Sequence, residues 1–162
     1  MYKPISIISI EPIGLKTVCD IEVQNDHTYV ANGILNHNSD PNAQQFPRVA
    51  CLDGTELIHT NMGNIPIKEL CPKEKGTKIN EHQLLVFTSH KRYMPVALFI
   101  NKGETEMYKV TLEDGSTVKC TMDHIFLTNQ GYMKLRDALK DENIKLLAYD
   151  KDEIGSTEIS GS

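Results

Sequence analysis

The fold is decided by the stretch YVANGILNHNS at residues 29–39, read together with CLDGTELI at residues 51–58. The first stretch begins with a short apolar run that is typical of a strand, and it continues through Asn32-Gly33, a strong turn signal. It ends on a His37-Asn38 pair directly before Ser39. The second stretch opens on Cys51. Residues that can carry out chemistry on a peptide backbone therefore lie about a dozen positions apart.

Short strands with frequent turns extend outward from these two stretches. Pro12 and Gly14 are expected to end the first strand, and residues 72–82 are expected to form a charged loop. One helical turn is expected within 65–70 and another within 134–139. This pattern predicts an all-β domain. The strand candidates cover residues 5–10, 18–23, 29–31, 55–60, 84–87, 96–100, 107–112, 117–121 and 146–149.

Composition excludes several classes of protein. The 162 residues are 40% hydrophobic with a formal net charge of −5, so we expect a folded domain without a basic surface for nucleic acid. No apolar run is long enough for a membrane span, and no signal peptide is visible, so no membrane partner is expected. We expect a cytoplasmic protein.

The four cysteines form no CxxC pair, and they fit a reducing compartment. Cys19 and Cys120 are expected to be buried in strands. The spacing of cysteine and histidine matches no dedicated metal site, so neither a metal nor a cofactor is expected. The remaining histidines are expected at the surface, and these are His59, His82 and His90.

Four separate motifs resemble those of inteins. CLDGTELI resembles the start of an intein, and ANGILNHNS resembles the end of one followed by its first downstream residue. The run TLEDGSTVKCTMDH at residues 111–124 resembles the block that carries a Thr-x-x-His motif, and residues 18–27 resemble the strand that delivers an acid and a histidine. The resemblance covers most of the chain. It implies the all-β, horseshoe-shaped Hint (hedgehog/intein) fold of a minimal or split intein.

The order of the motifs is inverted, because the end-like segment precedes the start-like segment. Residues 1–38 resemble a C-terminal intein segment and residues 51–150 an N-terminal one, and the two are expected to form one Hint domain. Residues 39–50 are expected to be an extein-like linker and residues 151–162 a polar tail. We interpret this order as a permuted or engineered fusion.

The resemblance assigns four residues to the upstream junction. Cys51 is the nucleophile whose thiol attacks the carbonyl of the preceding residue and converts an amide into a thioester. Thr121 and His124 are expected to contact this amide, with His124 protonating the leaving nitrogen. Asp20 is expected to bond the Cys51 thiol and to couple the two junctions.

Four other residues are assigned to the downstream junction. Asn38 is expected to cyclise onto its own backbone carbonyl, with proton transfer from His37 and further help from His27. Ser39 supplies the hydroxyl that takes over the acyl group. Asn36 stands where the family carries an apolar residue, which predicts looser packing of its strand.

The implied function is protein splicing in a single turnover, rather than enzymatic turnover. The substrate is the chain's own segment 39–50, which is expected to leave as a backbone-cyclised peptide. A complementary intein fragment, or a second copy of the chain by domain swapping, is a possible partner.

Three alternatives stay open. The first is a Hint domain that only cleaves, although the His37-Asn38-Ser39 run would then be unnecessary. The second is a hydrolase that uses Cys51 and His124 on other proteins, although no motif for an oxyanion hole is visible. The third is a β-rich binding module without chemistry.

Overall fold

The computed structural model describes residues 2–37 and 52–149. The described residues are all-β, as the sequence predicts, with 61% of them in strands and 6% in helices. The predicted linker at 39–50 and the polar tail at 151–162 lie outside the described residues. The elements of the described part are β1 (Tyr2–Ile5), β2 (Ile7–Val23), β3 (Thr28–Ala31), β4 (Ile34–His37), β5 (Leu52–Asp53), β6 (Leu57–Thr60), β7 (Gly63–Pro66), α1 (Ile67–Leu70), β8 (Gly76–Ile79), β9 (Leu85–Phe87), β10 (Tyr93–Leu112), β11 (Thr117–Cys120), β12 (Ile125–Thr128), β13 (Gly131–Lys134), α2 (Leu135–Ala138) and β14 (Leu146–Tyr149).

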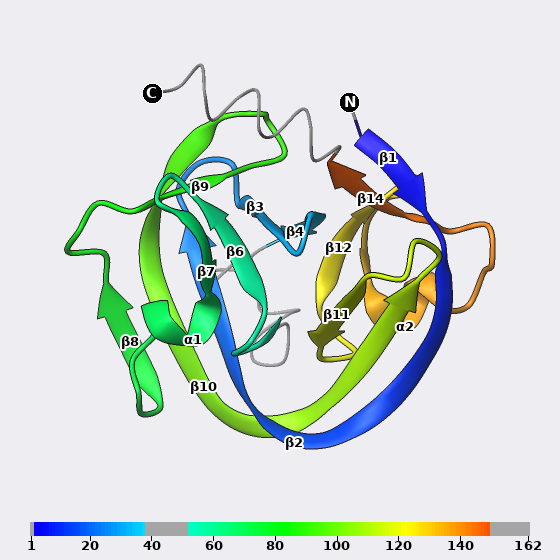
Figure 1. Cartoon of the computed structure of the whole chain (residues 1–162), viewed down its shortest axis with the longest axis horizontal. Helices are drawn as coiled ribbons and strands as arrows, with labels where there is room; N and C mark the ends of the chain where they lie inside the picture. Colours follow the sequence, from blue (N-terminus) through cyan, green and yellow to red (C-terminus); the bar gives the residue numbers. More distant parts are fainter. Residues whose placement is uncertain (1, 38–51, 150–162) are drawn as a thin grey trace.

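The two longest strands, β2 and β10, form the frame of the molecule. They pair antiparallel over fifteen residue pairs, and the register shifts at four places. Each shift inserts one extra residue, and such bulges bend a strand and increase its twist. The bent pair runs as one long arc around the lower edge of Figure 1, with β3, β4, β6 and β12 inside it and β8 on its outer side.

The sheet joins the two segments that flank residues 38–51. All pairings are antiparallel, and the main path runs β1-β14-β12-β4-β3-β6-β9-β10-β11-β5-β2. Each of β1, β2, β3 and β4 from residues 2–37 pairs with at least one strand from residues 52–149. The two segments therefore share one sheet, and Figure 1 shows β3 and β4 enclosed by strands of the later segment.

Two predictions about which residues form strands were wrong. Pro12 and Gly14 do not stop the first strand, because the bulge at Ile13 lies between them and Gly14 adopts a φ of 86°. Residues 76–79, expected in a loop, form β8, because they pair with Leu98–Asn101 of β10. All four residues of β8 are exposed, so no buried-face pattern marks the strand in the sequence.

Other expectations about local structure were confirmed. The predicted Asn32-Gly33 turn joins β3 to β4. The helical turns appear as α1 and α2, and β14 covers the predicted 146–149. In the described part of the chain, no helix is long and apolar enough to span a membrane.

The core lies between the arc and the shorter strands. It contains Cys19, Ile21 and Val23 of β2 together with residues of β3, β6, β10, β11 and β12. Cys19 and Cys120 are buried as predicted, and Cys71 is buried as well. Each such side chain contributes to stability by removing apolar surface from water, about 1.5–3 kcal/mol for a fully buried large residue.

One histidine differs from the expectation. His82 and His90 are exposed, as predicted, but His59 is only 8% exposed. Its Nε2 atom lies 3.1 Å from the Tyr93 hydroxyl and its Nδ1 atom 3.3 Å from Asn64 Oδ1. The reason is that β6 is an interior strand with neighbours on both sides, so polar residues on it find partners within the fold.

Candidate functional site

The site is built around the segment Cys120–Ile125, which receives both ends of the described chain next to residues 38–51. Leu52, the first described residue after Cys51, pairs with Cys120. His37, the last described residue before Asn38, pairs with Ile125. The two ends therefore reach opposite ends of one six-residue segment. The predicted site residues Asn38, Ser39 and Cys51 lie outside the described residues.

The centre of this segment is a tight turn. The His124 N–H donates to the Thr121 carbonyl at 3.1 Å. Helix α2 supports the turn from its other side, because the Leu135 N–H donates to the His124 carbonyl at 2.8 Å and the Arg136 N–H to the Met122 carbonyl at 2.9 Å. Amides at a helix start have no partner inside the helix, so these bonds satisfy both the helix and the turn. Thr121 and His124 are thereby held in a fixed relative position.

His124 is fully buried and its ring is oriented by two contacts. Its Nε2 atom lies 2.8 Å from the side-chain oxygen of Asn36 on β4. Its ring packs edge-on against Phe126, with centroids 4.7 Å apart. The prediction that Asn36 loosens its strand was wrong, because Asn36 is also fully buried and its side-chain amide donates to the Ile34 carbonyl at 2.7 Å.

These bonds determine which nitrogen of His124 carries the proton in the neutral ring. The Asn36 amide group already donates to Ile34, so the atom that faces His124 is the Asn36 oxygen, which can only accept. Nε2 is therefore the donor, and Nδ1 carries the lone pair. A ring held in this tautomer can accept or deliver a proton at Nδ1 without turning.

Asp20 lies on β2, next to the strand that begins at Leu52. Leu52 pairs with Cys19 on one side and Cys120 on the other. Cys19 and Cys120 therefore lie two strand spacings apart, about 9–10 Å, and Asp20 and Thr121 follow them on the two sides of Leu52. Lys102, the extra residue of a β10 bulge, brings its Nζ atom to 3.9 Å from the fully buried carboxylate of Asp20. The carboxylate also accepts the Ile21 N–H at 2.9 Å.

Two histidines and a tyrosine form a row beside the other end of the segment. The rings of His27 and His37 lie roughly parallel with centroids 6.4 Å apart. The ring of Tyr132 on β13 packs edge-on against His37 with centroids 4.8 Å apart. His27 precedes β3, whose first residue, Thr28, pairs with His37. His27 is exposed, so it lies at the rim of the site.

The five predicted residues that the structure describes thus form two groups joined by the 121–124 turn. Asp20 and Thr121 lie on the two sides of Leu52, whereas His27 and His37 lie beside Ile125. His124 bridges the groups through Asn36.

Sequence reasoning missed Asn36 and Tyr132 as members of the site. The available signal was a polar residue, Asn36, directly after the apolar pair Ile34-Leu35, because a polar side chain that is buried with such a pair needs a specific partner.

No group of three or more His, Cys, Asp or Glu side chains within residues 2–37 and 52–149 is arranged to hold a metal ion. What the described site offers is a buried imidazole of fixed tautomer, a buried carboxylate and a pair of histidines at the rim. No protein-family model matches the chain, and no curated protein matches it.

Proposed function

We propose that the chain is a protein-splicing domain of the intein type, with a Hint fold in which residues 1–38 and 51–150 form one domain. Its substrate is its own segment 39–50. Splicing here releases that segment as a ring of twelve residues and leaves two chains, 1–38 and 51–162.

One observation carries the proposal. Leu52 and His37 pair with the two ends of the Cys120–Ile125 segment, and the fixed imidazole of His124 lies within it. A splicing domain needs the residues next to both scissile bonds close to one proton-transfer group. A hydrolase acting on other proteins has no need for the two ends of its own chain to meet at such a group.

The first step is an N-to-S acyl shift. The Cys51 sulfur bonds to the Ala50 carbonyl carbon, the Ala50–Cys51 C–N bond breaks, and the proton from the thiol ends on the Cys51 amine. Because a thioester is less stable than an amide, the shift requires protonation of the leaving nitrogen. His124 suits this task because its Nδ1 atom can take the proton from the thiol and pass it to the leaving nitrogen, while Asn36 holds Nε2. Thr121 is fixed three residues before it by the turn bond.

The next steps join the ends of the segment. The Ser39 hydroxyl displaces the Cys51 thiol from Ala50 and forms an ester. The Asn38 side-chain nitrogen then attacks its own backbone carbonyl, the Asn38–Ser39 bond breaks, and the proton from that nitrogen ends on the Ser39 amine. His37 directly precedes Asn38 in the chain and its ring stacks with that of His27, so both imidazoles suit the proton transfers. An O-to-N shift finally makes the Ala50–Ser39 amide.

Intact-mass measurement before and after incubation with a thiol tests the proposal. Splicing consumes no water, so the masses of residues 1–38, the ring 39–50 and residues 51–162 are expected to sum to the mass of the starting chain. A linear 39–50 peptide, heavier than the ring by one water, would indicate cleavage without ligation. A chain whose mass never changes, and which cleaves no added protein, would support the binding module instead.

A further inference from the structure

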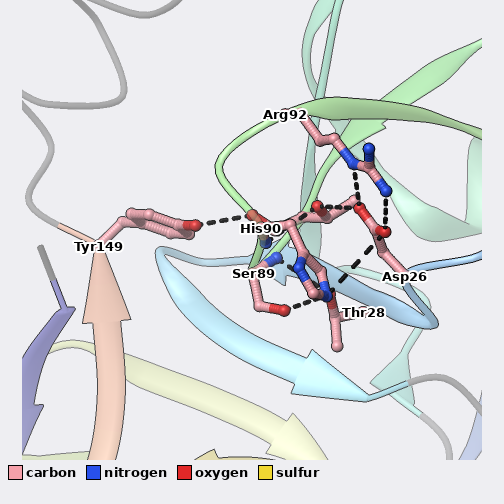
Figure 2. A network of polar contacts seen from close by, with 7 residues as sticks. Asp26, Thr28, Ser89, His90, Arg92 and Tyr149 are labelled. Carbon is pink, nitrogen blue, oxygen red and sulfur yellow. Dashed lines mark hydrogen bonds and ion pairs between the residues drawn. The ribbon is translucent and has the colours of Figure 1, made fainter.

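A network of polar contacts surrounds the buried carboxylate of Asp26, the residue before His27. Asp26 accepts two bonds from the Arg92 guanidinium, from Nη2 at 2.6 Å and from Nε at 3.0 Å. It also accepts the Thr88 hydroxyl at 2.7 Å. Figure 2 shows Arg92 reaching Asp26 from one side and His90 from the other, with the His90 Nε2 atom 4.0 Å away. The Asp26 side chain is 3% exposed, whereas that of Arg92 is 55% exposed.

The same network continues to two other strands. The Thr28 hydroxyl lies 2.8 Å from the Ser89 hydroxyl and accepts the Ser89 N–H at 2.9 Å. The Tyr149 hydroxyl donates to the Thr88 carbonyl at 2.7 Å. Figure 2 shows Thr28, Ser89 and Tyr149 arranged around the loop that leads to Arg92. The residues on both sides of His27 are therefore attached to one loop, residues 88–92, of the later segment.

His27 itself has an unusual backbone. Its φ is 55° and that of Asn25 is 63°, both in the left-handed region that residues with a side chain adopt at a cost. Such conformations persist when the surroundings fix them. Here the attachments of Asp26 and Thr28 fix the backbone on each side of His27. The direction of its imidazole follows from that backbone, which places the ring parallel to His37.

We infer that Asp26 and Arg92 are positioning residues for the downstream junction, because they hold His27 in the conformation that faces His37. The inference rests on the proposed function. Arg92 belongs to the later segment and Asp26 to the earlier one. The association of the two segments therefore also fixes the conformation of His27. The guanidinium matters by its shape as well as its charge, since two of its nitrogens meet the carboxylate in one plane.

The kinetic test compares the two junctions in a double-mutant cycle. Arg92→Ala is expected to slow release after Asn38 about tenfold and to leave thiol-induced cleavage before Cys51 unchanged. In a His27→Ala background, Arg92→Ala is expected to have no further effect on release after Asn38, because the group it positions is gone. Arg92→Lys is expected to restore only part of the rate. Equal slowing by Arg92→Ala with and without His27 would overturn the inference, as would equal slowing at both junctions.

A second measurement does not depend on activity. In a chain carrying Cys51→Ala and Asn38→Ala, Arg92→Ala is expected to shift the NMR ring signals of His27 and His37 and to leave those of His82 in place. Lys140→Ala, which removes another surface ion pair, is the matched control and is expected to shift neither. Unmoved His27 signals would overturn the inference. If the unsubstituted chain releases no fragment, the proposed function is what fails, and the ring signals still decide whether Arg92 positions His27.

Discussion

The Asn36 side-chain oxygen lies 2.8 Å from His124 Nε2, although 88 positions separate the two residues in the sequence. The bond crosses from β4 of the earlier segment to the turn before β12 of the later one. It fixes the tautomer of the imidazole and is fully buried at both ends. The position of the proton on the neutral His124 ring therefore depends on a residue that contributes no proton itself.

Replacing Asn36 tests this dependence. In Asn36→Leu, the buried Nε2–H loses its acceptor, which is expected to lower the free energy of unfolding by about 1–3 kcal/mol. Thiol-induced cleavage before Cys51 is expected to slow about tenfold, because the ring is no longer held. Both are measured on the full chain, by urea titration and by intact mass over time.

Asn80→Ala is the matched control for that variant. The Asn80 side chain also makes several backbone hydrogen bonds, to Leu84 and Val96, but it lies outside the site. It is expected to lower the stability and leave the cleavage rate unchanged. Equal cleavage rates in Asn36→Leu and the parent chain would show that Asn36 does not orient the His124 ring for catalysis.

The buried carboxyl of Glu56 predicts a pH-dependent stability. Glu56 accepts the Lys119 N–H at 2.6 Å and a hydrogen bond from the Asn32 side chain. Burial raises the pKa of this carboxyl to about 7 from an ordinary value of 4.5, in spite of these two donors. Since the folded-state pKa is the higher one, the stabilisation from Glu56 is complete below about pH 4.5 and is lost as the pH rises through about 7.

Glu56→Gln removes this titration. The difference in free energy of unfolding between Glu56→Gln and the parent chain is expected to change by about 3 kcal/mol between pH 4 and pH 8, in favour of the variant at pH 8. This figure follows because each unit of pKa shift corresponds to about 1.4 kcal/mol. The measurement is urea unfolding at both pH values in a Cys51→Ala, Asn38→Ala background, in which no splicing intervenes. A difference that is the same at both pH values would contradict the raised pKa.

Two single variants are expected to separate the chemical steps. Cys51→Ala abolishes thiol-induced cleavage before residue 51, because no other group can form the thioester. Asn38→Ala blocks release at Ser39 and still allows thiol to cleave before Cys51. Gel electrophoresis and mass spectrometry identify the fragments. Cleavage before residue 51 that persists in Cys51→Ala would exclude Cys51 as the nucleophile.

The three cysteines that the structure describes are expected to resist alkylation in the folded chain. Cys19, Cys71 and Cys120 are at most 6% exposed. Burial raises the pKa of Cys120, and the neighbouring Cys19 thiol together with burial raises the pKa of Cys71, so little reactive thiolate forms there. The hydrogen bond with Cys71 lowers the pKa of Cys19, so the protection of Cys19 depends on its burial. In a Cys51→Ala chain, iodoacetamide is expected to add mass only after denaturant is present. Rapid labelling under native conditions would contradict the burial.

The all-β class followed from the sequence because strand and turn signals act locally. The Asn32-Gly33 turn and the apolar run at 146–149 could be identified without knowledge of the rest of the chain. The long pairing of β2 with β10 was not predictable in the same way. Pro12 and Gly14 read as strand breakers, and the bulge that accommodates them depends on a partner about 95 positions away.

The candidate site shows the same division. His124 could be selected from its Thr-x-x-His spacing, but its acceptor Asn36 could not, since the bond exists only once β4 lies beside β12. The prediction that His59 lies at the surface was wrong for a similar reason, because its partner Tyr93 belongs to β10. Strand β8 was missed because its side chains are all exposed and its pairing depends on β10.

Strands β2 and β10 belong to different segments, so cutting the backbone between residues 37 and 52 removes none of the residue pairs between them. What the cut removes is the tether that keeps the local concentration of each segment high. From then on, the survival of the sheet is governed by mass action, and dilution alone becomes a way to melt it.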